Sequence, residues 1–69
     1  MIDKLKVKQL FLDLITYHNF MVNNVEFRSD VMVGMSQNSI GHLLCCAEDA
    51  GYITEKELDL LEALIITHI

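Results

Sequence analysis

The chain has 69 residues, enough for one domain over residues 1–69, and a domain of this size is only marginally stable unless something adds to its core. Its hydrophobic fraction of 52% is more than a small core can bury, so the surplus predicts self-association, most simply as a homodimer. The formal net charge of -5 disfavours binding to nucleic acid and to anionic lipid, because clustered Lys and Arg drive both kinds of binding.

The first predicted helix runs from Asp3 to about Met21. Apolar residues recur there at three- and four-residue intervals, and no Gly or Pro interrupts them. They cover nearly half of the helix circumference, so one neighbouring helix would not bury them all. His18 lies in the middle of this stripe, where a hydrogen-bonded interior or interface histidine is the first interpretation, ahead of a metal ligand or a pH sensor. The stripe consists of Val7, Leu10, Phe11, Leu14, Ile15, Tyr17, Met21 and Val22.

The segment after the first helix is the least informative part of the sequence. Asn23 and Asn24 end the helix, because their side-chain amides compete for backbone hydrogen bonds. From residue 25 to residue 33, β-branched and aromatic residues partly alternate with other types. This fits either a short extended piece or a helical turn that starts at Ser29 or Asp30. Two strands alone are marginal in water, so no stable sheet is expected.

The second predicted helix runs from about Gln37 to Ala50. Gly34 and the polar residues after it mark its start, and Ser36 or Asn38 is the expected N-cap. Its core face is expected to contain Ile40, Leu43, Leu44, Ala47 and Ala50.

A helical hairpin with its turn at Gly51 follows. Glycine accepts the left-handed conformation that ends many helices, and Tyr52 behind it can fold back on the helix, as in a Schellman motif. Thr54 and Glu57 have the spacing of a capping box, which predicts the start of the next helix.

The third predicted helix runs from Thr54 or Glu55 to the end of the chain. Ile53 and Leu58 stand at the two positions of a hydrophobic staple, which fixes how the chain enters this helix. Its last two turns are apolar almost all round, which is unfavourable in a solvent-exposed tail. The inward face is expected to contain Leu58, Leu61, Leu64, Ile65 and Ile69, with Leu60 extending it.

These elements predict an all-α fold, a small bundle of three helices with a C-terminal helical hairpin that turns at Gly51. Each helix in such a bundle buries only the stripe that faces the other two, so the remaining apolar surface is expected to form a protein interface. The sequence leaves open which interface candidates serve the core of the monomer. These candidates are Leu10, Leu14, Tyr17, Met21, Leu61, Leu64, Ile65 and Ile69.

The sequence also predicts a cytoplasmic protein with no membrane partner. No apolar run approaches the roughly 18 residues that span a bilayer, and Asp13 interrupts the lysine-bearing start before a signal-peptide core develops. Cys45 and Cys46 point about 100° apart on a helix and cannot form an ordinary disulfide there, which fits a reducing compartment. Cys46 borders the core face and is expected to be buried, whereas Cys45 is expected to be exposed.

Metal binding and catalysis are weaker alternatives. His42 and Cys46 are four residues apart on one helix, with His18 and His68 on the other two, but the spacing matches no zinc signature. Cys45 and His42 offer a nucleophile and a base, yet nothing in the sequence organises a third group or an oxyanion site. The sequence therefore predicts no metal, no cofactor and no enzymatic activity.

The stretch around Gly51 is similar to the turn of two other two-helix motifs. With Gly51 at the sixth place of an EF-hand loop, Glu57 takes the twelfth, but Cys46 and Ala50 stand where early oxygen ligands belong. Ala47 and Gly51 also have the spacing of the DNA-binding helix-turn-helix, although the helix that would enter the groove is acidic.

The function predicted from the sequence is a small acidic protein-protein interaction module that self-associates and binds a further, unidentified protein. Its composition looks like that of accessory or regulatory proteins of bacteria and their phages, including inhibitors of a host protein. The alternative is a helix-turn-helix regulator of transcription. A third possibility is an inhibitor whose acidic face occupies a basic nucleic-acid site on a target, although the same residues also make an ordinary solvated helix face. These acids are Glu48, Asp49, Glu55, Glu57, Asp59 and Glu62.

Overall fold

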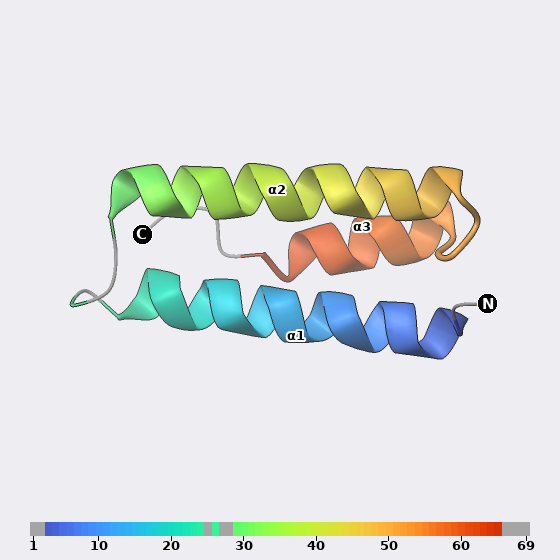
Figure 1. Cartoon of the computed structure of the whole chain (residues 1–69), viewed down its shortest axis with the longest axis horizontal. Helices are drawn as coiled ribbons and strands as arrows, with labels where there is room; N and C mark the ends of the chain where they lie inside the picture. Colours follow the sequence, from blue (N-terminus) through green and yellow to red (C-terminus); the bar gives the residue numbers. More distant parts are fainter. Residues whose placement is uncertain (1–2, 25, 27–28, 66–69) are drawn as a thin grey trace.

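The computed structural model describes residues 3–24, 26 and 29–65. Over these residues the chain is all-helical, with three helices and no strand, as the sequence predicts. α1 (Lys4–Asn23) and α2 (Asp30–Asp49) have 20 residues each, and α3 (Glu55–Ala63) has 9. Figure 1 shows α1 and α2 lying antiparallel along the length of the molecule, with the shorter α3 against the pair.

α1 has the extent that its sequence predicts, to within two residues. The carboxylate of Asp3 accepts the backbone N–H of Leu5 at 2.9 Å, so Asp3 is the N-cap. Asn24 has an extended backbone and ends the helix. The buried residues of α1 are Phe11, Ile15, His18 and Val22, and their spacing of three or four makes one continuous stripe.

α2 begins at Asp30 and not, as predicted, at about Gln37. Ser29 is its N-cap, and the side-chain oxygen of Ser29 accepts the backbone N–H of Met32 at 3.1 Å. Of the two interpretations of this segment, the helical start at Ser29 or Asp30 is therefore correct. The charge of Asp30 also stabilises the first turn, because the N-terminal end of the helix dipole is positive.

The predicted boundary inside α2 is wrong because tertiary packing outweighs local preference there. Gly34, Ser36 and Asn38 lie within the helix, so neither Ser36 nor Asn38 is its N-cap. A glycine inside a helix costs about 1 kcal/mol relative to Ala. The same stretch buries Val33 and Ile40, and burial of such a side chain contributes roughly 1.5–3 kcal/mol.

The turn between α2 and α3 forms as predicted. Gly51 has a φ of 83°, the left-handed conformation. The backbone N–H of Tyr52 donates to the carbonyl of Ala47 at 2.9 Å, and that of Gly51 donates to the carbonyl of Glu48 at 3.0 Å. These two bonds define the Schellman motif. No atom lies within 4 Å of a Cβ built on Gly51, so its backbone conformation and not a lack of space requires glycine.

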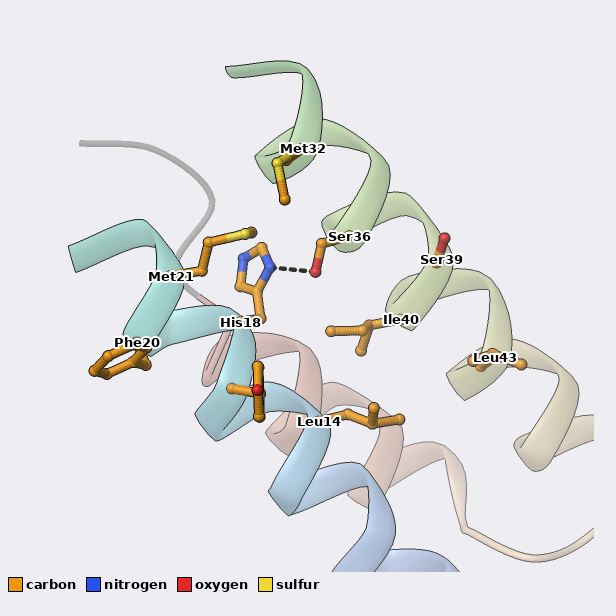
Figure 2. A pocket seen from close by; sticks show the side chains of 10 residues that line it. Leu14, His18, Phe20, Met21, Met32, Ser36, Ser39, Ile40 and Leu43 are labelled. Carbon is orange, nitrogen blue, oxygen red and sulfur yellow. Dashed lines mark hydrogen bonds between the residues drawn. The ribbon is translucent and has the colours of Figure 1, made fainter. Parts of the chain in front are cut away.

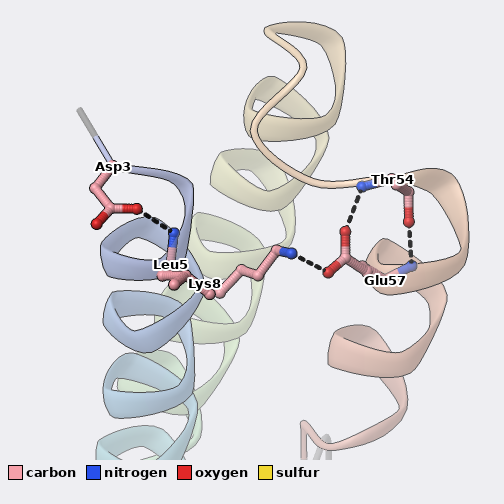
Figure 3. A network of polar contacts seen from close by, with 5 residues as sticks. All are labelled: Asp3, Leu5, Lys8, Thr54 and Glu57. Carbon is pink, nitrogen blue, oxygen red and sulfur yellow. Dashed lines mark hydrogen bonds and ion pairs between the residues drawn. The ribbon is translucent and has the colours of Figure 1, made fainter. Parts of the chain in front are cut away.

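The start of α3 also forms as predicted. The hydroxyl of Thr54 accepts the backbone N–H of Glu57, and the carboxylate of Glu57 accepts the backbone N–H of Thr54, which completes the capping box (Figure 3). Ile53 is buried in the core, and Leu58 packs against the same cluster, consistent with the hydrophobic staple.

The end of α3 comes earlier than predicted. The helix ends at Ala63, and Leu64 is the C-cap. The backbone N–H groups of Leu64 and Ile65 bond to carbonyls three residues back, which tightens the last turn. The side-chain amide of Asn19 on α1 donates to the carbonyl of Leu64 at 2.8 Å and satisfies one of the carbonyls that the helix end leaves unpaired. The predicted continuation to Ile69 lies beyond the described residues.

The core lies where the three helices meet. Leu44 is its most buried member, with 0% of its surface exposed. Val7, Tyr52, Leu58 and Ile65 are partly buried and pack against it. The buried cluster consists of Phe11, Ile15, Ile40, Leu44, Ala47, Ile53 and Leu61.

Five predicted core positions are wrong. On α2, Ile40, Leu44 and Ala47 are buried as expected, but Leu43, Cys46 and Ala50 are exposed. Successive helix residues diverge by about 100°, and these three point to the side of α2 away from its buried stripe. On α3, Leu64 is 51% exposed because it follows the last helical turn. Leu60, expected to extend the inward face, is 62% exposed because it points about 100° away from the buried Leu61. Cys45 is exposed, as predicted.

Candidate functional site

An apolar groove lies between α1 and α2. Its volume is about 520 Å³, and residues of both long helices line it, but none of α3. Figure 2 shows the side chains of the two helices facing one another across the groove, with α3 behind it. We call this feature the α1–α2 groove. It is lined by Leu14, Tyr17, His18, Phe20, Met21, Met32, Ser36, Ser39, Ile40 and Leu43.

The helical spacing of the sequence produces this groove. On α1, Leu14, Tyr17 and Met21 follow one another at intervals of three and four, and so form one stripe. The same spacing on α2 forms a second stripe, which consists of Met32, Ser36, Ser39 and Leu43. The two helices lie side by side (Figure 1), and the two stripes therefore form the two walls of the groove.

Large apolar side chains are exposed along these walls. Tyr17 is 79% exposed, Phe20 58%, Met32 53% and Leu43 49%. Aromatic and methionine side chains are typical of interfaces, because they supply much contact area and, for methionine, adapt to the shape of a partner.

None of the described residues that line the groove is Asp, Glu, Lys or Arg. Its buried polar side chain is His18, which is 2% exposed. His18 Nδ1 lies 2.8 Å from Ser36 Oγ, and this hydrogen bond joins α1 to α2 (Figure 2). His18 is thus a hydrogen-bonded interior histidine, which was the first interpretation of its sequence position. Because this polar pair is satisfied within the molecule, the remaining groove surface is largely apolar.

The structure brings together only part of the predicted interface. Leu14, Tyr17 and Met21 line the α1–α2 groove, and the exposed Leu10 continues their stripe along α1. Leu61 lies in the core at 8% exposure and therefore serves the monomer. Ile65 packs against the core, Leu64 lies at the end of α3 outside the groove, and Ile69 is beyond the described residues.

Sequence reasoning missed the α2 wall of the groove. The sequence allows either an extended piece or a helical turn around Met32. It therefore does not show that Met32 shares one helix face with Ser36, Ser39 and Leu43. A signal for it exists in the sequence. Residues 31–47 contain no Asp, Glu, Lys or Arg, and a helix without charged residues is not expected to expose a polar face to solvent.

Charged contacts lie on the side of the molecule that α3 covers. Lys8 of α1 forms an ion pair with Glu57 of α3 (Figure 3). The Lys8 ammonium, and after it the backbone N–H of Thr54, lower the pKa of the Glu57 carboxyl below its usual value. Glu57 therefore serves the capping box and the contact between α1 and α3 at once.

The candidate metal ligands and thiols do not assemble into a metal site in the described part of the chain. His42, Cys45 and Glu62 line a second, more polar groove of about 400 Å³ between α2 and α3. No group of three His, Cys, Asp or Glu side chains is arranged to hold an ion among the residues described. Cys46 is exposed on another face of α2, and His68 lies outside the described residues.

No protein-family model, curated protein or solved structure matches this chain. Within the described ranges, each helix is too short or too polar to cross a bilayer.

Proposed function

We propose that this protein is a small protein-protein interaction module that self-associates, most simply as a homodimer, through the α1–α2 groove. The observation that carries the proposal is the groove itself, an apolar channel on the side of α1 and α2 away from α3, whose described lining residues include no Asp, Glu, Lys or Arg. Such a surface is costly to expose on a small protein, and contiguous apolar patches of this kind mark protein interfaces.

Energetics favour a partner of protein size. Burial of apolar surface contributes about 25 cal/mol per Å², so a few hundred Å² per chain contributes several kcal/mol before the cost of association is subtracted. That amount matters for a small domain, whose own stability is of similar size. The groove is also open along its length, whereas a small-molecule site encloses most of its ligand.

A module of this kind acts by binding to the surface of another protein. We therefore propose an accessory or regulatory role, which includes inhibition of a host protein by a phage-type factor. The cytoplasm is the compartment we propose, since Cys45 and Cys46 are both free thiols and one helix holds them apart.

A DNA-binding regulator is the alternative, and the α2–α3 hairpin turning at Gly51 is the feature that favours it. The exposed side chains of α3 disfavour it, because Glu55, Asp59 and Glu62 outnumber Lys56 and would repel phosphates. We expect no retention of duplex DNA at physiological salt. Sequence-specific binding that weakens when Lys56 is replaced would favour the alternative instead.

The test of the proposed function is molecular mass in solution across dilution, combined with substitutions in the groove. We expect the wild-type chain to dissociate on dilution from high to low micromolar concentration, with a melting temperature that falls in parallel. Tyr17→Ser and Leu43→Ser should each weaken association at least tenfold. Leu60→Ser is the matched control, since Leu60 is 62% exposed but does not line the groove.

A chain that stays monomeric at high micromolar concentration, with a melting temperature independent of concentration, would contradict the proposed function. An equal loss of association in Leu60→Ser would place the interface elsewhere.

A further inference from the structure

Resting on the proposed role as a protein-interaction module, we infer that the α1–α2 groove binds a single amphipathic helix of another protein, whose apolar stripe is flanked by Lys or Arg. This helix lies on α1 and α2 opposite α3, and the four helices together make a four-helix bundle. A second copy of the chain covers the groove until this partner replaces it.

The opposite side of the same two helices already holds such a helix. α3 has 9 residues and is therefore about 14 Å long. It packs on the core through Leu58 and Leu61, and its Glu57 pairs with Lys8 of α1 beside that apolar contact. The α1–α2 pair thus binds a short helix by an apolar stripe with an opposite charge next to it.

The size of the groove also fits one helix. Its lining residues span positions 14–21 of α1 and 32–43 of α2, which are about 10 Å and 17 Å of helix. A helix that anchors in a groove through residues i, i+3 or i+4, and i+7 needs about 10 Å between its outer anchors. Packed helix axes lie about 8–10 Å apart, so the space above two of them accepts one further helix. A helix similar in length to α3 therefore covers the walls.

The stripe of the partner that enters the groove is apolar, because the described lining includes no charged side chain. The flanks of the partner meet Asp13. This residue stands one turn before Tyr17 on α1, is exposed, and lines a hollow that shares Tyr17 and Phe20 with the groove. Gln9 donates to one Asp13 carboxylate oxygen at 3.0 Å, and a carboxylate can accept further hydrogen bonds, so Asp13 can also bind a cation.

Charge complementarity thus favours a partner with basic flanks. On the side that α3 covers, a base of α1, Lys8, meets an acid of the bound helix. On the open side α1 offers an acid instead. Residues 9–47 contain Asp13, Glu26 and Asp30 but only one base, Arg28, and the formal net charge of -5 also attracts a basic segment.

The experiment measures binding of two synthetic peptides to the full chain by fluorescence anisotropy. Each peptide is Ala-rich, about 16 residues long and thus able to form a helix, with leucines in one stripe. The flanks of the stripe are lysines in the first peptide and glutamates in the second. We expect the lysine peptide to bind at least about tenfold more tightly at low ionic strength, and the difference to narrow as salt is added.

Substitutions separate contact in the groove from attraction by net charge. Asp13→Asn should weaken binding of the lysine peptide about two- to fivefold. Asp59→Asn is the matched control, because it changes the net charge equally at an exposed position of α3, and it should have a clearly smaller effect. Tyr17→Ser should weaken both peptides by at least about tenfold, and Leu60→Ser should weaken neither. Circular dichroism establishes that each variant is folded.

Three results would overturn the inference. They are equal binding of the two peptides or binding of neither, equal losses in Asp13→Asn and Asp59→Asn, and binding that Tyr17→Ser leaves unchanged. Solution mass of the same samples tests the proposed self-association separately. A dimer that the lysine peptide does not dissociate assigns the groove to the second copy alone and also overturns the inference. A chain that is monomeric throughout, yet binds the lysine peptide as expected, contradicts self-association and supports the inference.

Discussion

The two sides of the α1–α2 pair differ in what covers them. On one side α3 is held to α1 near both of its ends, by the ion pair of Lys8 with Glu57 and by the hydrogen bond of Asn19 with Leu64. On the other side the α1–α2 groove exposes large apolar side chains such as Tyr17 and Met32. Polar contacts thus border the surface that α3 covers, whereas the described lining of the groove includes no charged side chain.

The lengths of the helices explain this difference. α3 has 9 residues, against 20 in each of the other two helices. A helix of 9 residues is about 14 Å long, so it covers one side of a pair that is about 30 Å long and covers it only in part. The remaining apolar stripe of each long helix is exposed in the single chain. Four predictions, given from the largest expected effect to the smallest, test this contrast.

Adjacent leucines on α2 offer the sharpest comparison of the two sides. Leu44 is 0% exposed in the core, whereas Leu43 is 49% exposed in the groove wall. We expect Leu44→Ala to lower the free energy of unfolding by about 2–5 kcal/mol, through lost burial and a cavity. Leu43→Ala should change the unfolding of the monomer by well under about 1 kcal/mol and instead weaken association. Urea denaturation at low protein concentration measures the first effect, and dilution measures the second.

Equal losses for the two variants at low concentration would contradict the assignment of Leu43 to a surface and of Leu44 to the core. A Leu44→Ala chain that is unfolded at all concentrations agrees with the prediction, since the loss is comparable with the whole stability of a domain this small.

The second prediction concerns glycine at the turn and glycine within a helix. Gly51 has a positive φ, so Gly51→Val should destabilise the fold by well over about 1 kcal/mol through backbone strain. Gly34 is helical, and nothing lies within 4 Å of a Cβ built on it. Gly34→Ala should therefore stabilise α2, by about 0.5–1 kcal/mol. Thermal unfolding of both variants should show shifts of opposite sign, and an unchanged melting temperature for Gly51→Val would remove the Schellman turn as a source of stability.

The third prediction concerns the N-cap of α3. Thr54→Ala should cost about 1 kcal/mol, because the backbone N–H of Glu57 loses its side-chain acceptor. Thr16→Ala is the control, since the hydroxyl of Thr16 bonds the carbonyl of Leu12 within α1 and caps nothing. It should change stability by no more than about 0.5 kcal/mol. Chemical denaturation compares the two, and similar losses would mean that Thr54 does not set the start of α3.

Local sequence signals predicted the α2–α3 turn and the start of α3, but not the start of α2. The turn at Gly51 and the cap at Thr54 were predictable, because each depends on a few neighbouring residues with one preferred backbone conformation. The start of α2 was not, because Gly34, Ser36 and Asn38 favour a boundary locally, and only the packing of Val33 and Ile40 against distant residues holds them in a helix. Half of the groove was missed for the same reason, since the α2 wall appears only when Met32 and Leu43 share one helix.

The α1 wall was predictable in part. The stripe of Leu10, Leu14, Tyr17 and Met21 follows from helical spacing alone, but spacing cannot tell which side a short third helix will cover. That choice depends on the reach of Lys8 to Glu57 and of Asn19 to Leu64, contacts between residues far apart in the sequence. For the same reason Leu61 stood both on the predicted inward face and among the interface candidates, and the structure places it in the core.

The smallest effect is expected from pH, through the ion pair that holds α3 to α1. The pKa of the Glu57 carboxyl is lowered in the folded chain, first by the Lys8 ammonium and then by the Thr54 backbone N–H. A group whose pKa is lower in the folded state binds protons more weakly there than in the unfolded state. Its contribution to stability is therefore fully present above the unfolded pKa and is lost as the pH falls through the folded pKa.

We expect Lys8→Met to raise the pKa of Glu57 toward its ordinary value without removing the whole shift, because the Thr54 N–H still donates to the carboxylate. The acid loss of stability should then be smaller and shifted to higher pH. Lys56→Met is the matched control, because Lys56 is exposed on the same helix and is not the partner of Glu57 in this ion pair. Titration of the Glu57 carboxyl by carbon NMR, with melts from neutral to acid pH, measures both quantities. An unchanged Glu57 titration in Lys8→Met would show that the ion pair does not form in solution, and α3 would then be held to α1 by the Asn19–Leu64 hydrogen bond and by core packing.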